Sequence, residues 1–581
     1  MIENNKEGEP VTSTISGSEK NKISSFINRH QLLIFMVVVI ILKQLLVIGL
    51  PLFAHAGAGH DDRLMINMAN ALINGEWLGD YSEKTLVKGL FFPLLLTINH
   101  ILGIPYSIGI PGFYSLACVI FIFGIKRLFP TDFPLYLIFM ALIFNPISFA
   151  DETFLRVYRN SVTAAQALIV IGCMFAIYLN RFEKPWIQLL WALGAGVGLA
   201  SLWHTREDGI WIIPLVMGVI VITCLSIFFN KEEQKWQKAR SILISWIPIG
   251  ILMLSVMIIS GINYAQYGIY TTNELNNSNF TQAIKLIYAV KPNEDINRTS
   301  VPRSSVEKIY AVSPTLNSIR DQLDASLDRW SWYEKDAKVR QVEDGFFFWA
   351  LREAVANSGY YENAGKANAF YQKVADELSA GFEKGELMKR PTMPSALMSP
   401  WRDAYWEALP AAFFRTMDYV VGYEAIETTM TDSIDDGKNG IQLFEEITKN
   451  PAYRQGERIR LRNQIRITIL NAITVIYQLT GRLVFMVSVL AYIGISLGTL
   501  FKKWRQKYRL LDCWLVLSAL ILSAIVVAIG VAYTDISAYV AVSYWYLAGA
   551  YPLICVFNVM ALYKMMEIII AVGYKKRKTK R

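Results

Sequence analysis

Apolar stretches long enough to cross a lipid bilayer alternate with short charged stretches along most of the chain. About 20 apolar residues of helix are needed to cross a hydrocarbon core about 30 Å thick. By this measure the sequence predicts ten spans, at residues 31–53, 106–127, 133–149, 161–179, 186–203, 210–229, 242–262, 467–501, 511–532 and 538–563. We therefore expect an α-helical polytopic membrane protein.

Two shorter segments between the first two spans show a different pattern. From Asp62 to Gly75, apolar residues recur at helical spacing with asparagines on the other side, which predicts an amphipathic helix in the membrane interface. The segment 89–102, "GLFFPLLLTINHIL", has a short apolar run that is broken by Asn99 and His100. A segment of this length is compatible with an interfacial helix as well as with a span.

The positions of the basic residues decide between these alternatives. If 89–102 lies on the surface, the basic stretches 126–127, 181–184, 231–240, 502–509 and 575–581 all fall on one side of the membrane. That side is predicted to be cytoplasmic, because Lys and Arg are enriched in cytoplasmic loops. Both termini are then cytoplasmic, and residues 54–105, 150–160, 204–209 and 263–466 lie on the outer face of the cell membrane.

This topology divides the chain into five parts. Residues 1–30 are polar and lack apolar periodicity, so we expect a disordered cytoplasmic tail. Residues 31–262 form a transmembrane core of seven spans that includes the first outer loop, 54–105. An extracytoplasmic domain at 263–466, three further spans at 467–563 and a basic cytoplasmic tail at 564–581 follow.

Composition agrees with this arrangement and excludes some classes of protein. An apolar content of 53% and a mean hydropathy of +0.31 do not describe a soluble chain. The net charge of +9 does not indicate nucleic-acid binding, since the basic residues lie between apolar runs, where they orient helices. All five cysteines lie in apolar segments without a CxxC motif, so we expect small core residues.

The outer region 263–466 is too long for a passive connection and should fold as a mostly helical domain. Residues 344–361 and 362–385 have helical patterns, with Gly381 as the expected C-cap of the second. Its aromatic residues are candidates for stacking on sugar rings, among them Trp330, Trp332, Trp349, Tyr360, Tyr361 and Trp401. The alternative is that aromatic residues at helical spacing are core, which we favour for Phe346, Phe347 and Trp349. From its position, we expect the domain to select the acceptor.

The candidate chemistry begins with Asp61 and Asp62, which open the first predicted interfacial helix. A carboxylate there can cap free backbone N–H groups, or it can act in catalysis at the mouth of a membrane cavity. The residue pair alone does not distinguish the two roles.

Cations on the same outer face favour a functional site. They are Lys88, Arg156, Arg159, His204 and Arg206. Outer loops usually avoid Lys and Arg, so this set predicts a bound anion, which we infer to be a phosphate. The alternative is ordinary ion pairing, of Arg156 with Asp151 or Glu152 and of Arg206 with Asp208 or Glu207.

These residues carry a resemblance to a known family. An acidic pair, an amphipathic helix, "NGEWLGDY", "KGLFFP" and a span ending in "GIKRLFP" stand in that order. The order resembles the first outer loop of GT-C membrane glycosyltransferases, in the branch of protein O-mannosyltransferases and the aminoarabinose transferase of lipid A modification. "GVGLASLWHTREDGIWIIPL" is similar to a glycine-rich span and its following turn in these enzymes. The resemblance covers residues 35–262. The sequence departs from the family pattern in two places: Asp62 stands where several relatives have Glu, and the spacing from the acids to the Gly-Glu-Trp turn differs by one residue.

The resemblance implies transfer of a sugar, with inversion, from a polyprenyl-phosphate carrier to a hydroxyl of a glycan, lipid or protein acceptor. Asp61 matches the family's first acid and is the expected general base, with Asp62 kept open. Lys88 and Arg206 are the first candidates for the donor phosphate, Arg156 and Arg159 the second, and His204 the third. No cofactor is required, although a divalent cation held by Asp61 and Asp62 is an alternative.

Two other functions stay open at this point. A polymerase or ligase of lipid-linked glycans would share the spans and the outer domain but would need no acid in the first loop. A transporter or flippase is the non-enzyme alternative, against which ionisable residues are sparse within the spans and no inverted repeat is evident. Lys43 is the exception, a lysine inside the first predicted span.

Overall fold

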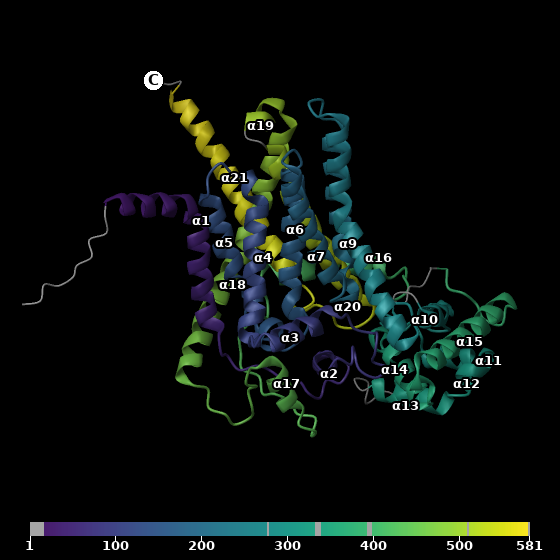
Figure 1. Cartoon of the computed structure of the whole chain (residues 1–581). Coiled ribbons are helices and arrows are strands. Elements are labelled where there is room, and N and C mark those ends of the chain that lie inside the picture. The colour runs from purple at the N-terminus through teal and green to yellow at the C-terminus, as the bar shows by residue number, and fades with distance from the viewer. Residues whose placement is uncertain (1–16, 276–277, 332–337, 392–397, 508–509, 579–581) are drawn as a thin grey trace, which may run out of the picture.

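The computed structural model describes residues 17–275, 278–331, 338–391, 398–507 and 510–578, and helices make up most of these ranges (Figure 1). Within these ranges, nine helices are long and apolar enough to cross a membrane, or ten if a bent pair counts as one span. The spanning helices are α1 (Gly17–Val47), α4 (Tyr106–Ile125), α6 (Asn160–Leu179), α7 (Pro185–Trp203), α8 (Ile213–Phe228), α9 (Lys235–Tyr267), α18 (Leu461–Leu500), α20 (Leu510–Ser537) and α21 (Ala550–Lys578). The predicted polytopic helical fold of about ten spans is confirmed.

The tenth span is interrupted in its middle. Helix α5 (Phe133–Ile143) and the segment Pro146–Leu155 meet at an angle of 53°. The residue before a proline is disfavoured in α-helix, and the side chain of Asn145 accepts a hydrogen bond from Ile147 N instead of continuing the helix. The segment after the break consists of η2 (Pro146–Ser148) and η3 (Asp151–Leu155). It carries the chain to the end of the bundle where the predicted site residues lie.

Helix α6 is the centre of the bundle, because nearly all of its residues are buried. It packs closely on α4 and α7. A Cβ atom at Gly124 of α4 would lie 2.3 Å from the carbonyl oxygen of Gly172 on α6. Only glycine therefore allows the two backbones to approach this closely.

Lys43 has a place in this core. Its ammonium group is fully buried in α1, donates to Ser148 Oγ at 2.7 Å and lies 4.4 Å from the centre of the Tyr114 ring. The lysine thus ties α1 to α4 and to the segment after the break. The lysine inside the first predicted span therefore forms a contact between helices.

Several helix ends in the structure differ from the predicted boundaries. Helix α1 begins at Gly17, so helix replaces much of the tail predicted to be disordered, while residues 1–16 lie outside the described ranges. Helix α21 continues to Lys578, into the predicted basic tail. The predicted span 538–563 begins only at Ala550, because Asp535 Oδ1 accepts from the backbone of Ala541 and Val542 and turns 538–549 into a loop.

The region predicted to lie on the outer face forms a helical unit with its own core, called the outer unit below, seen at the lower right of Figure 1. Its helices are α10 (Asn279–Ala289), α11 (Arg303–Val312), α12 (Pro314–Asn317), α13 (Arg320–Trp330), α14 (Asp344–Asn357) and α15 (Ala364–Glu383). Both helices predicted in this region are present. Gly381 is not the C-cap of α15. It is buried against Val312 inside the helix, and the glycine in the left-handed conformation is Gly385, with φ +75°.

Residues 405–428 depart from the predicted outer domain. Helix α16 (Tyr405–Val421) packs along α20. Tyr423 after it is buried against Tyr477 of α18 and Tyr551 of α21, and its hydroxyl is within 3.2 Å of Asn145 Nδ2. This part of the region 263–466 is therefore inserted among the spans. Pro410, Arg415 and Asp418 interrupt its apolar pattern, which is why hydropathy did not place it there.

Three short helices cover the end of the bundle that carries the site. They are α2 (Asp62–Ile73), α3 (Phe91–Ile101) and α17 (Gly440–Thr448). The first two match the predicted interfacial helices, and α17 packs on both of them. The first turns of α1, the helix α19 (Lys502–Lys507) and the end of α21 lie at the opposite end of the bundle (Figure 1).

Candidate active site

Asp61 lies in the turn just before α2, where the first loop meets the residues that follow the broken span. Its carboxylate makes no capping hydrogen bond to α2. Asp61 Oδ1 instead accepts from Lys88 Nζ and from the Tyr158 hydroxyl, both at 2.8 Å. The side chain of Asp61 is 45% exposed, whereas that of Lys88 is 10% exposed. The capping role is thus not supported for Asp61. Its carboxylate is partly exposed to solvent, while the Lys88 ammonium beside it is buried.

Tyr158 connects the groups around Asp61, and the sequence did not single it out. Its oxygen accepts from Lys88 Nζ at 3.4 Å and from Arg159 Nε at 3.2 Å, while its hydroxyl donates to Asp61. The guanidinium carbons of Arg156 and Arg159 lie 5.1 and 5.6 Å from the centre of its ring. A tyrosine between two candidate cations, in "RVYRN", was the available signal.

The charge state of Asp61 follows from these contacts. Burial acts to raise the pKa of Asp61, but the Lys88 ammonium, the hydrogen bonds from Lys88 and Tyr158, and the charge of Arg159 lower it further than burial raises it. The pKa lies below its usual range, so the carboxylate is ionised at neutral pH. It can accept a proton or bind a cationic group, but it cannot donate a proton.

Asp62 has different surroundings. Its side chain is fully buried, and both of its oxygens accept from Arg156, from Nε at 2.7 Å and from Nη2 at 2.6 Å. Burial raises the pKa of Asp62, and the bidentate guanidinium opposes that rise. Arg156 Nη1 also donates to Glu152 at 2.8 Å, which is one of the ion pairs considered as the alternative. Asp62 therefore joins α2 to the residues after the broken span, and its catalytic role, kept open in the sequence, stays a prediction.

The remaining arginines are held by acids as well. Arg159 Nη1 donates to both carboxylate oxygens of Glu207 at 2.8 Å and to the carbonyl of Thr205 at 3.1 Å. Arg206 forms two bonds of 2.7 Å to Asp208, which is the other ion pair considered. Arg159 and Arg206 are each 8% exposed. Both guanidinium groups are thus fixed in position close to the surface.

His204 is not among these cations. Its Nε2 lies 3.0 Å from Ser255 Oγ on α9, and burial lowers its pKa to about 4. The imidazole is neutral at pH 7, so its predicted role as a cation for phosphate is not supported.

The backbone of His204 contacts the start of α3. The carbonyl oxygen of His204 accepts a hydrogen bond from Phe91 N at 2.9 Å, and a Cβ atom at Gly89 would lie 2.1 Å from that oxygen. The Lys-Gly pair therefore brings Lys88 to Asp61 through a contact that only glycine permits.

The loop 538–549 forms a further part of the site, called its aromatic wall. The Tyr544 hydroxyl donates to Asp151, and the guanidinium of Arg206 lies 5.3 Å from the centre of the Tyr546 ring. A Cβ atom at Gly345 of α14 would lie 2.3 Å from Tyr539, so the loop also contacts the outer helices. The sequence missed this wall because its aromatic residues were counted into a span.

The outer unit reaches the site through aromatic residues. His60 lies between Trp330 and Trp349, with ring centres 5.1 and 4.8 Å away, and Lys88 Nζ lies 5.7 Å from the centre of a Trp349 ring. Trp349 is buried, as expected for a core residue, while Trp330 is half-buried. His60 was not singled out in the sequence.

The other aromatic candidates lie elsewhere. Phe347 is buried in the outer core and Phe346 packs against it, in agreement with the prediction. Tyr361 is buried against Tyr81, Tyr360 packs on Phe370, and Trp401 stacks on Tyr533. Trp332 lies outside the described residues. The contacts to His60 and Lys88 thus come from two of the six candidates, Trp330 and Trp349.

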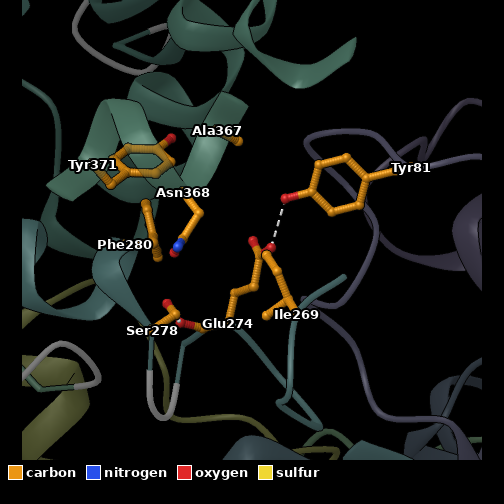
Figure 2. A pocket seen from close by; sticks show the side chains of 8 residues that line it. All are labelled: Tyr81, Ile269, Glu274, Ser278, Phe280, Ala367, Asn368 and Tyr371. Atoms are coloured by element: carbon orange, nitrogen blue, oxygen red, sulfur yellow. Dashed lines mark hydrogen bonds between the residues drawn. The ribbon is translucent and has the colours of Figure 1, made fainter. Parts of the chain in front are cut away.

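A buried polar network fastens the outer unit to the first loop. The Tyr81 hydroxyl and Arg352 Nη1 donate to the two oxygens of Glu274, both at 2.6 Å. Figure 2 shows the Tyr81–Glu274 bond beside a small pocket. None of the residues that line this pocket surrounds Asp61, so we assign the network to the attachment of the outer unit.

No cluster of three or more His, Cys, Asp or Glu residues suited to a metal ion occurs within the described ranges. The alternative of a cation shared by Asp61 and Asp62 meets a specific obstacle. Both oxygens of Asp62 already accept from Arg156, and the ammonium of Lys88 occupies the cation position beside Asp61.

Comparison with known proteins gives two solved structures. No family model and no curated protein match the chain. It is similar to the crystal structure of ArnT from Cupriavidus metallidurans in the apo state, at 11% identity over 87% of this chain and 78% of that chain, with a TM-score of 0.31. It is also similar to the Archaeoglobus fulgidus oligosaccharyltransferase in complex with Zn and sulfate, at 10% identity over 72% of this chain and 62% of that chain, with a TM-score of 0.26.

Proposed function

We propose that the protein is an integral-membrane glycosyltransferase. It moves a sugar from a polyprenyl-phosphate donor to a hydroxyl of a surface glycan, lipid or protein on the extracytoplasmic face, with inversion at the anomeric carbon. The observation that carries the proposal is the Asp61 carboxylate, 45% exposed and ionised, between the buried cations Lys88 and Arg159.

In the proposed reaction, Asp61 accepts the proton of the acceptor hydroxyl as its oxygen attacks the anomeric carbon. The new C–O bond forms on the face opposite the phosphate, and the old C–O bond breaks with its electron pair on the phosphate oxygen. The products are the glycosylated acceptor, polyprenyl phosphate and a protonated Asp61. The proton then passes to solvent through the exposed side of the carboxylate.

The departing phosphate needs its growing negative charge stabilised by groups that are already in place. Lys88 and Arg159 suit this role, because both contact the Tyr158 hydroxyl beside Asp61. Lys88 also links the binding of the donor phosphate to the basicity of Asp61. Its charge lowers the pKa of Asp61, so a phosphate that takes part of this charge makes Asp61 a better proton acceptor.

In this proposal Arg156 and Arg206 stabilise the structure around the site and do not bind the phosphate. Arg156 holds Asp62 and therefore the start of α2, and Arg206 is held by Asp208 and the Tyr546 ring. No metal is required, since the cations of the chain supply the charge next to the leaving group.

The proposal is tested by mass spectrometry of surface glycans, glycolipids and polyprenyl-linked sugars from cells with and without the gene. We expect one sugar to disappear from a surface molecule and the corresponding polyprenyl-phosphate sugar to accumulate. If neither pool changes, the protein is not a transferase of this class. Accumulation of a complete lipid-linked glycan, in place of a single sugar on its carrier, would instead identify the polymerase or ligase.

A further inference from the structure

Three arginines at the outer end of α18 have no place in the proposed reaction. Arg458, Arg460 and Arg462 are exposed, and among the described residues no carboxylate lies within ion-pair distance of them. Their neighbours in the chain do have partners: Arg454 pairs with Glu445 at 2.7 Å, and Arg466 donates to the carbonyl of Ile48 at 2.7 Å. Three like charges within five residues repel each other unless an anion is present.

The three arginines lie close to the level at which two spans end. Arg466 contacts Ile48, directly after α1. Two further bonds, from Leu52 N to the carbonyl of Pro451 and from Tyr453 N to the carbonyl of Leu52, tie the preceding loop to the same segment. Figure 1 shows the start of α18 beside the end of α1, on the side of the bundle away from the outer helices.

The first turns of α18 also expose apolar residues. Leu461, Ile465 and Ile469 are 70%, 53% and 41% exposed and repeat every four residues along one face of the helix. A helix face of this kind lies against acyl chains, while nearby arginines reach the phosphate layer. Guanidinium groups bind phosphate in a bidentate manner.

We propose that Arg458, Arg460 and Arg462 form a binding site for the phosphate headgroups of anionic phospholipids in the leaflet beside the start of α18. The apolar face formed by Leu461, Ile465 and Ile469 lies against their acyl chains. This site anchors the outer end of α18 next to α1. It is independent of the glycosyltransferase proposal, because none of its residues contacts the group around Asp61.

The test uses the purified full chain in neutral detergent, titrated with phosphatidylglycerol or with phosphatidylcholine and observed by native mass spectrometry. The variant R458Q/R460Q/R462Q removes the site, and R458K/R460K/R462K keeps its charge. The matched control K366Q/K373Q/K384Q removes the same charge from exposed positions on and just after α15. A further series adds inorganic phosphate as a competitor.

We expect the native chain and the control to bind phosphatidylglycerol more tightly than phosphatidylcholine. Each arginine near an anionic surface contributes appreciably, so the glutamine variant should bind phosphatidylglycerol at least about tenfold more weakly, and the lysine variant should recover most of the affinity. Equal binding by the native chain and the glutamine variant would overturn the proposal, as would an equal loss in the control. Displacement by millimolar inorganic phosphate would show a free-phosphate site in place of a lipid site.

Discussion

Asp61 and Asp62 are neighbours in the chain, yet their side chains have different surroundings. Asp61 is outside the helix and reaches solvent, while Asp62 begins α2 and is enclosed by Arg156. The sequence identified both acids and all of the arginines, because charged residues in outer loops are conspicuous. It offered the local pairs Arg156–Glu152 and Arg206–Asp208, which the structure contains. It could not assign Arg156 to Asp62, because these two residues are about one hundred positions apart in the chain. Tyr158 escaped notice because its role depends on those contacts.

Replacing Asp62 by Asn tests its structural role. The change leaves the Arg156 guanidinium with Glu152 alone, and breaking a buried ion pair typically costs about 3 to 5 kcal/mol. We expect a value near the lower end of that range, because Arg156 stays partly exposed. Thermal unfolding in detergent measures the loss. E362Q, at an exposed pair with Lys366, is the control and should change little. Equal stability of D62N and the native chain would contradict the assignment.

Replacing Tyr158 by Phe tests the link between the hydroxyl and Asp61. The Tyr158 hydrogen bond lowers the pKa of Asp61, so its removal should raise that pKa. A carboxylate base loses activity as pH falls through its pKa. We therefore expect the acid limb of the pH–rate profile to move to higher pH in the Tyr158→Phe variant. An acid limb that does not move would show that the hydroxyl acts only in packing.

At the scale of elements, apolar length predicted the spans and the two interfacial helices well, because a bilayer imposes a fixed length of apolar helix. It failed where polarity and aromatic content are mixed. The loop 538–549 contains enough aromatic residues to resemble a span, and α16 contains enough charge to resemble an outer helix. In both cases contacts with distant helices decide the position.

The Gly89→Ala substitution tests the contact that sets the start of α3. The added Cβ atom would meet the His204 carbonyl oxygen at 2.1 Å, so the backbone must shift and carry Lys88 away from Asp61. A displacement of about 1 Å in a catalytic site can lower the rate about 100-fold. G112A is the matched control, because a Cβ atom there meets nothing within 4 Å. Similar activity of the two variants would contradict this role for Gly89.

At the scale of the whole molecule, the site lies where three parts of the chain meet: the first loop, the end of the broken span and the outer helices. His60 lies at this junction between Trp330 and Trp349. Burial, together with Lys84, lowers its pKa to about 4, and burial has the same effect on His204. Both histidines are therefore neutral in the folded protein at pH 7.

A dependence of stability on pH follows. In the unfolded chain these histidines take up protons near pH 6.5, whereas in the folded chain they do so only near pH 4. Between these values the unfolded state binds more protons, so stability falls as pH falls. The melting temperature should decrease from pH 7 to pH 5, and less steeply in the H60Q/H204Q variant. Parallel curves for the two proteins would show that these histidines do not cause the loss of stability.

The most direct test of the central claim compares Asp61 with its amide. Cells that lack the gene would receive the native chain, D61N or the control E76Q, which alters an exposed acid of the same loop, at equal protein levels. General-base catalysis contributes about 10² to 10⁴ in rate. Mass spectrometry of surface glycans should therefore show the sugar restored by the native chain and by E76Q but not by D61N. Restoration by D61N would show that Asp61 is not the base.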